Sequence, residues 1–92
     1  MKFAFLIMGE FAGECAQICG GAARLCGVSS LAEACHAAKR LAEEGVGCIE
    51  LCGAFGEKGA REIIRATEGR IPVGFVTHLP EQDALYRRIF GR

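Results

Sequence analysis

The feature that most constrains the fold is a helical pattern lying between two short apolar runs. Within 31–42, apolar side chains recur at steps of three and four, which predicts an amphipathic helix with one face on the core. Ser30 and Glu33 predict a capping box at its start, and Gly45 a left-handed cap after its end. The run 46–52 is typical of a parallel strand covered on both faces, and the run 24–28 predicts another strand.

The rest of the chain repeats this alternation. We expect a strand over 3–8, a short helix or ordered loop over 9–21, a helix stripe over 60–67 that Gly69 and Pro72 end, a strand over 73–77 and a final helix from Pro80. Strands that alternate with helices favour parallel pairing with right-handed crossovers. The sequence therefore predicts a single small α/β domain over 1–92. About four mainly parallel strands carry helices packed on the sheet, in the order β-α-β-α-β-α-β-α.

Composition narrows the possible partners. Eleven basic and eleven acidic residues cancel, so the basic surface typical of a nucleic-acid or anionic-membrane binder is not expected. The apolar run 3–8 is too short for a secretory signal, and no run approaches the roughly 20 apolar residues of a membrane span. We therefore expect a cytoplasmic protein. A short chain with no net charge and with Ala- and Gly-rich surfaces is also expected to pair with itself, as a homodimer or larger ring.

Two loops are candidate binding sites because the carboxyl ends of parallel strands commonly hold ligands. The first is glycine-rich and precedes a helix, whose positive end attracts anions. The second ends the last predicted strand. Together they predict a site for a small anionic metabolite, with these candidate residues: Gly53, Gly56, Glu57, Lys58, Gly59, Thr77 and His78. The alternative is a glycine-rich turn that serves tight packing.

A second hypothesis is that the protein is an enzyme that uses Cys52 and His78. If their strands are neighbours, both lie at carboxyl ends, and an imidazole beside a thiol suits a nucleophile and its base. Alternatively, His78 is a hydrogen-bonded structural residue. A third possibility is a structural subunit that acts through partner proteins.

Glu50 is the polar residue least expected in the run 46–52, and it shares one face with Cys48 and Cys52 by strand alternation. An unpaired buried carboxylate is costly. Glu50 is therefore expected on an edge, beside a base such as Lys2, Arg24 or Lys58, or poised for function with a raised pKa.

The six cysteines are expected as free thiols. Cys15 and Cys19 have a spacing that can supply two metal ligands, but Cys26, Cys35 and His36 complete no known pattern. Neither a metal nor a cofactor is expected.

Two segments, SSLAEACHAAKRLAEEGVGCIELCGAFGEKGAREI and IPVGFVTHLP, carry the motifs ELCG-x-FG and PVG-x-VTHLP. They resemble a family of short, uncharacterised prokaryotic α/β proteins over roughly residues 27–80. The resemblance implies an α/β fold and transfers no catalytic role.

Overall fold

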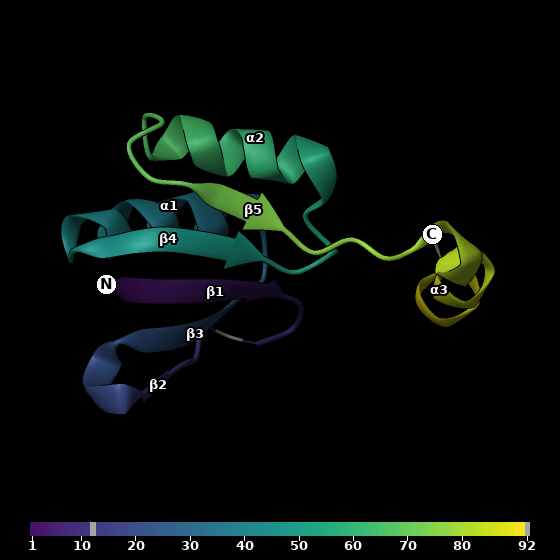
Figure 1. Cartoon of the computed structure of the whole chain (residues 1–92), viewed down its shortest axis with the longest axis horizontal. Coiled ribbons are helices and arrows are strands. Elements are labelled where there is room, and N and C mark those ends of the chain that lie inside the picture. Colours follow the sequence, from purple (N-terminus) through teal and green to yellow (C-terminus); the bar gives the residue numbers. More distant parts are fainter. Residues whose placement is uncertain (12, 92) are drawn as a thin grey trace.

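A mixed five-stranded sheet forms the centre of the molecule (Figure 1). The computed structural model describes residues 1–11 and 13–91. The strand order is β2-β3-β1-β4-β5, in which β2 is antiparallel to β3 and the other pairs are parallel. The strands are β1 (Lys2–Met8), β2 (Cys15–Ile18), β3 (Ala23–Val28), β4 (Val46–Leu51) and β5 (Val73–Phe75). The α/β class and the mainly parallel sheet are confirmed.

Two helices, α1 (Leu31–Glu43) and α2 (Gly56–Ala66), lie together on one side of the sheet (Figure 1). The Oγ of Ser30 accepts a hydrogen bond from the Glu33 N–H at 3.1 Å, so the predicted N-cap of α1 is confirmed. The Glu33 carboxylate accepts instead from the hydroxyl of Ser29, at 2.7 Å. Gly45 has a φ of 92°, as a left-handed cap requires. α2 begins four residues before the stripe expected from Ala60.

The two faces of the sheet differ. Buried side chains of the strands, such as Ala4, Leu6, Ile49 and Leu51, pack with the inner sides of α1 and α2 to form the core. The alternate positions face the other way, where the described residues supply no helix, and remain half-buried or exposed. The prediction that the strand over 46–52 is covered on both faces is therefore wrong within this chain: only its α1–α2 side is covered. A parallel-strand pattern does not reveal how many helices are available to cover it.

The segment 9–21 also differs from the expected helix or loop. It contains the edge strand β2 and a 3₁₀ turn, η1 (Cys19–Gly21), which together make a hairpin with β3. All four β2 residues are exposed. Because neither face of this strand is buried, the sequence carries no alternation that would reveal it. The hairpin adds the fifth strand.

After β5 the chain runs over 76–79 without regular structure. It then forms the 3₁₀ turn η2 (Pro80–Gln82) and the helix α3 (Asp83–Phe90). Pro80 opens the 3₁₀ turn, and the helix expected from Pro80 begins at Asp83. Figure 1 shows α3 beyond the carboxyl end of the sheet, separate from the layer of α1 and α2. Arg92 lies outside the described residues. None of the helices over 1–11 and 13–91 has the length and apolar character needed to cross a membrane.

Candidate functional site

A cleft of about 790 Å³ is lined by residues at the carboxyl ends of β1, β4 and β5 and by residues of α3. Its volume falls in the usual range for small-molecule sites. Three segments supply most of its lining: the end of β1, the loop after β4, and the chain from β5 to α3. The lining residues are Ile7, Met8, Phe11, Cys52, Gly53, Ala54, Gly56, Phe75, Val76, Thr77, His78, Asp83, Tyr86 and Phe90. The cleft therefore lies at the edge predicted from the strand pattern.

The loop after β4 has a shape that requires glycine. Gly56 has a φ of 62°, a conformation that side-chain-bearing residues rarely adopt. A Cβ on Gly53 would lie 3.4 Å from the carbonyl oxygen of Val76, so the two loops approach closely there. The Sγ of Cys52 accepts a hydrogen bond from the Met8 N–H at 3.3 Å, which ties this loop to the end of β1.

The loop after β5 positions His78. Its Nε2 lies 2.7 Å from Oδ1 of Asp83, and its ring stacks on Tyr86 with centroids 3.8 Å apart and planes 8° from parallel. Both partners belong to α3, so the imidazole connects the loop after β5 to this helix. The side chain of His78 is 30% exposed.

The predicted binding residues divide into two groups. Gly53, Gly56, Thr77 and His78 line the cleft, together with Cys52. Glu57, Lys58 and Gly59 do not: Glu57 forms an exposed ion pair with Arg61, Lys58 is exposed, and Gly59 is buried. A Cβ on Gly59 would lie 3.0 Å from the Cβ of Phe55, so this glycine allows close packing inside the helix layer.

Cys52 and His78 follow the ends of the neighbouring strands that the thiol–imidazole hypothesis requires, because β4 pairs with β5 in parallel. Their bonded partners are different, however. The thiol sulfur is bonded to the Met8 N–H, and the imidazole is bonded to Asp83. Among the described residues no hydrogen bond joins the two side chains. The structure therefore places both residues in one cleft without showing them as a bonded pair.

Aromatic and aliphatic walls are the part of the site that sequence reasoning missed. Phe75 ends β5, Phe11 follows β1, and Tyr86 and Phe90 lie one turn apart on α3, with rings 5.6 Å apart. The spacing of Tyr86 and Phe90 was a usable signal, since residues four apart share a helix face. By itself, this spacing indicates only that one side of the final helix is apolar. The fold shows that this side lines the cleft.

Glu50 lies on the side of the sheet away from α1 and α2. β4 is not an edge strand, and two of the three expected bases are engaged elsewhere: Lys2 donates to the Glu44 carbonyl at 3.2 Å and Arg24 pairs with the Glu44 carboxylate. The third, Lys58, is exposed on α2. The Glu50 carboxylate leans over β5, where a Cβ on Gly74 would lie 2.7 Å from its Oε2. The Cys48 thiol donates to Oε1 at 3.7 Å. Burial and the adjacent carboxylate raise the pKa of Cys48.

All six cysteines are free. Cys15 and Cys26 lie opposite each other on β2 and β3, yet Cys15 is exposed and Cys26 is buried. Burial, with a further contribution from Cys15, raises the pKa of Cys26 to about 12. In the part of the chain that the structure describes, no group of three or more His, Cys, Asp or Glu side chains is arranged to hold a metal ion.

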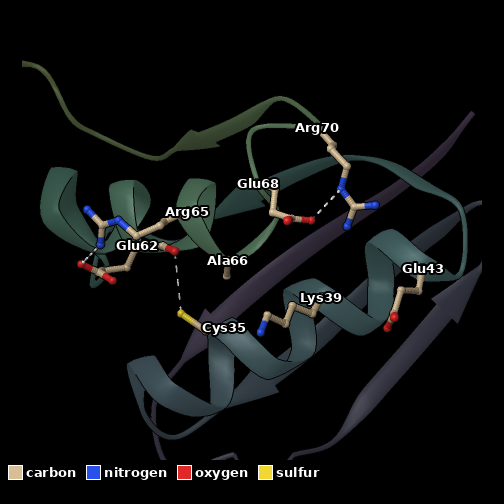
Figure 2. A pocket seen from close by; sticks show the side chains of 8 residues that line it. All are labelled: Cys35, Lys39, Glu43, Glu62, Arg65, Ala66, Glu68 and Arg70. Atoms are coloured by element: carbon tan, nitrogen blue, oxygen red, sulfur yellow. Dashed lines mark hydrogen bonds and ion pairs between the residues drawn. The ribbon is translucent and has the colours of Figure 1, made fainter.

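A second hollow, of about 540 Å³, lies between the outer sides of α1 and α2 (Figure 2). Its lining is charged, and much of that charge is already paired: Arg65 binds Glu62, and Arg70 lies 3.6 Å from Glu68. Figure 2 also shows the Cys35 thiol directed to the carbonyl of Glu62, at 3.9 Å. These internal pairs already use groups that would otherwise bind a ligand. The carboxyl-edge cleft is therefore the better candidate site.

Comparison with known proteins assigns the chain to a family but gives no activity. A family model described as a family of unknown function, DUF6506, matches residues 1–91. No curated protein and no solved structure matches the chain significantly. The resemblance to an uncharacterised family is thereby confirmed over nearly the whole chain: the protein belongs to the family of unknown function DUF6506.

Proposed function

We propose that this protein binds a small anionic metabolite with an apolar body in the carboxyl-edge cleft. The observation that carries the proposal is the lining itself: rings and aliphatic side chains form the walls, and the polar groups lie at the loops after β4 and β5, apart from Asp83 of α3, whose carboxylate pairs with His78. This combination is typical of small-molecule sites, in which apolar walls contribute burial and a few polar groups fix orientation.

The anionic group is assigned to the loop end of the cleft. Gly53 and Gly56 bring backbone close to the ligand space, and α2 begins at Gly56. The first N–H groups of a helix have no acceptor inside the helix and carry partial positive charge, so they favour an anion. The Thr77 hydroxyl adds a further donor at the same end.

Tyr86 allows a direct test, because the chain has one tyrosine and no tryptophan. Tyrosine emission therefore reports on the cleft alone. Three probes separate the two parts of the proposal: cyclohexylacetate carries body and charge, cyclohexylacetamide the body only, and acetate the charge only. We expect cyclohexylacetate to change the emission saturably and to bind about tenfold more tightly than either other probe. No saturable change below about 10 mM would contradict the proposal.

Variants locate the binding. Thr77→Val removes a donor from the loop end and is expected to weaken cyclohexylacetate binding, whereas the matched control Glu57→Gln lies outside the cleft and should leave it unchanged. Equal affinity for the acid and its amide would exclude the anion site while leaving the apolar site in place. Equal affinity for the acid and acetate would do the reverse.

Thiol chemistry at Cys52 is a second candidate, favoured by the shared lining of Cys52 and His78. If His78 activates the thiol, iodoacetamide near pH 6 should alkylate Cys52 rapidly and His78→Gln should slow the reaction. Cys48, whose pKa is raised by burial, provides the slow internal reference. Reaction of Cys52 no faster than Cys48 would exclude the enzyme and leave a binding protein or a structural subunit.

We also propose a cytoplasmic location, supported by the six free thiols, since a reducing compartment keeps cysteines in that form. Cell fractionation tests this directly. Recovery of the native protein outside the cytoplasmic fraction would contradict it.

A further inference from the structure

The side of the sheet opposite α1 and α2 is apolar along its central strands. We call it the open face and define it by Phe3, Phe5, Ile7, Ile18 and Leu25. The members on β1 and β3 alternate with buried positions, and Ile18 pairs with Ala23, which lies on the same face as Phe3. Ile18 is 66% and Leu25 43% exposed. Glu50 leaves this patch apolar, because its carboxylate leans over β5. A sheet in an α/β protein normally buries both faces, and no helix of the described chain packs along this one. Only its carboxyl end is covered: Phe11 packs over Gly27, and Ile7 lines the cleft.

α3, in turn, exposes apolar side chains that no sheet covers. Asp83, Tyr86 and Phe90 lie on the side of the helix that lines the cleft. Leu85 and Ile89, one turn apart, form a second apolar stripe about 100° around the helix from it. This second stripe is exposed, Ile89 by 72%. α3 is thus an amphipathic helix without a sheet beneath one of its apolar stripes.

The surface area of the molecule agrees with a missing partner. Its accessible surface is 5,935 Å². A folded monomer of 9.8 kDa is expected to expose about 5,200 Å². The excess, roughly 750 Å², is close to the share of about 800 Å² that each partner buries in a stable interface. A net charge of zero adds no long-range repulsion between copies.

We propose that a second copy of this chain covers the open face, with the Leu85–Ile89 stripe of each α3 packed on the open face of the other copy. In such a pair both apolar surfaces are covered, because the α3 of each copy packs on the open face of the other. The contact is reciprocal, as twofold symmetry requires. The α3 of a chain cannot cover the open face of the same chain. Its Tyr86 side lines its own cleft, and the arm over 76–79 spans only about 14 Å. The proposal goes beyond ligand binding and needs no ligand in the cleft.

Sedimentation equilibrium of the full chain tests this arrangement. The wild type should have twice the 9.8 kDa mass of one chain, and Ile89→Glu and Phe5→Glu should each reduce it to 9.8 kDa. The matched control is Ile64→Glu on the outer side of α2, where Ile64 is 40% exposed but belongs to neither surface; this variant should stay dimeric. A wild-type monomer at about 100 μM, or loss of the dimer in the control as well, would overturn the proposal.

Mixing the two variants distinguishes reciprocal α3 docking from simple contact between two open faces. In a mixed pair, the intact α3 of the Phe5→Glu copy meets the intact open face of the Ile89→Glu copy, so one of the two contacts is restored. We expect a 1:1 mixture to recover species of double mass that neither variant forms alone. A mixture that stays at the monomer mass would refute α3 docking. Circular dichroism checks that each variant is folded. Ile89 is already exposed, so we expect Ile89→Glu to fold, and its mass alone still tests the dimer if Phe5→Glu does not fold.

Discussion

The two faces of the sheet are built by the same strands and end in different environments. On the covered face, Ala4, Leu6, Ile49 and Leu51 are fully buried under α1 and α2. On the open face, their sequence neighbours Phe3, Phe5 and Ile7 stay half-buried. Both sets are apolar, so strand composition does not decide which face is closed. The number of helices that the chain places over the sheet decides it, and two helices close only one face.

The largest expected contrast comes from two leucines on opposite faces. Leu6 is 0% exposed and Leu25 is 43% exposed. Leu6→Ala leaves a cavity and should lower the free energy of unfolding by about 3–5 kcal/mol. Leu25→Ala should cost less than about 1 kcal/mol at protein concentrations near 1 μM. Urea titration followed by circular dichroism measures both; equal losses would contradict the difference between the faces.

Cys26 provides a pH test of the covered face. Its pKa is raised from 9.0 to about 12 in the folded chain, so the unfolded chain ionises first. Stability should therefore be unaffected by this thiol below about pH 9 and fall between about pH 9 and 12, by about 1 kcal/mol at pH 10. Urea midpoints for wild type and Cys26→Ala across this range isolate the effect. An identical slope in both proteins would show that Cys26 does not contribute.

The start of α1 tests how firmly the covered face is closed. Ser30→Ala removes the N-cap hydrogen bond and should cost about 1 kcal/mol. Its neighbour Ser29 bonds only to the exposed side chain of Glu33, so Ser29→Ala should cost less than about 0.5 kcal/mol. Equal urea midpoints for the two variants would be inconsistent with this capping geometry.

Gly74 tests the open face with the smallest effect. An added Cβ would meet only the Glu50 carboxylate, which can move toward solvent. Gly74→Ala should therefore cost about 0.5 kcal/mol, and Glu50→Ala should abolish that cost in the double variant. A cost that persists without the Glu50 carboxylate would show that the backbone, not this side chain, requires glycine.

The sequence predicted those helices and strands that have one buried side and one exposed side. The stripe of α1, the strands β1, β3 and β4, and the caps at Ser30 and Gly45 follow from periodicity and local hydrogen bonding. β2 was missed because its side chains are exposed on both faces, so no period exists to detect. The strand over 46–52 was wrongly expected to be covered twice. An apolar run shows that a strand is hydrophobic, but it does not show which elements pack on each of its faces.

The candidate site shows a similar division. Strand ends located Cys52, Gly53, Gly56, Thr77 and His78, because topology places carboxyl ends together. Spacing alone did not reveal that Glu57, Lys58 and Gly59 turn away from the cleft, or that Tyr86 and Phe90 enter it. Those facts depend on how α2 begins and where the arm over 76–79 carries α3, which are tertiary features.

The concentration dependence of unfolding tests most directly whether another copy closes the open face. A dimer is stabilised by mass action, so raising the chain from about 1 μM to about 100 μM should raise its stability by up to about 2.7 kcal/mol. The account predicts that the urea midpoint of the wild type rises over this range, whereas that of Ile89→Glu stays constant. A wild-type midpoint that is the same at both concentrations would contradict it.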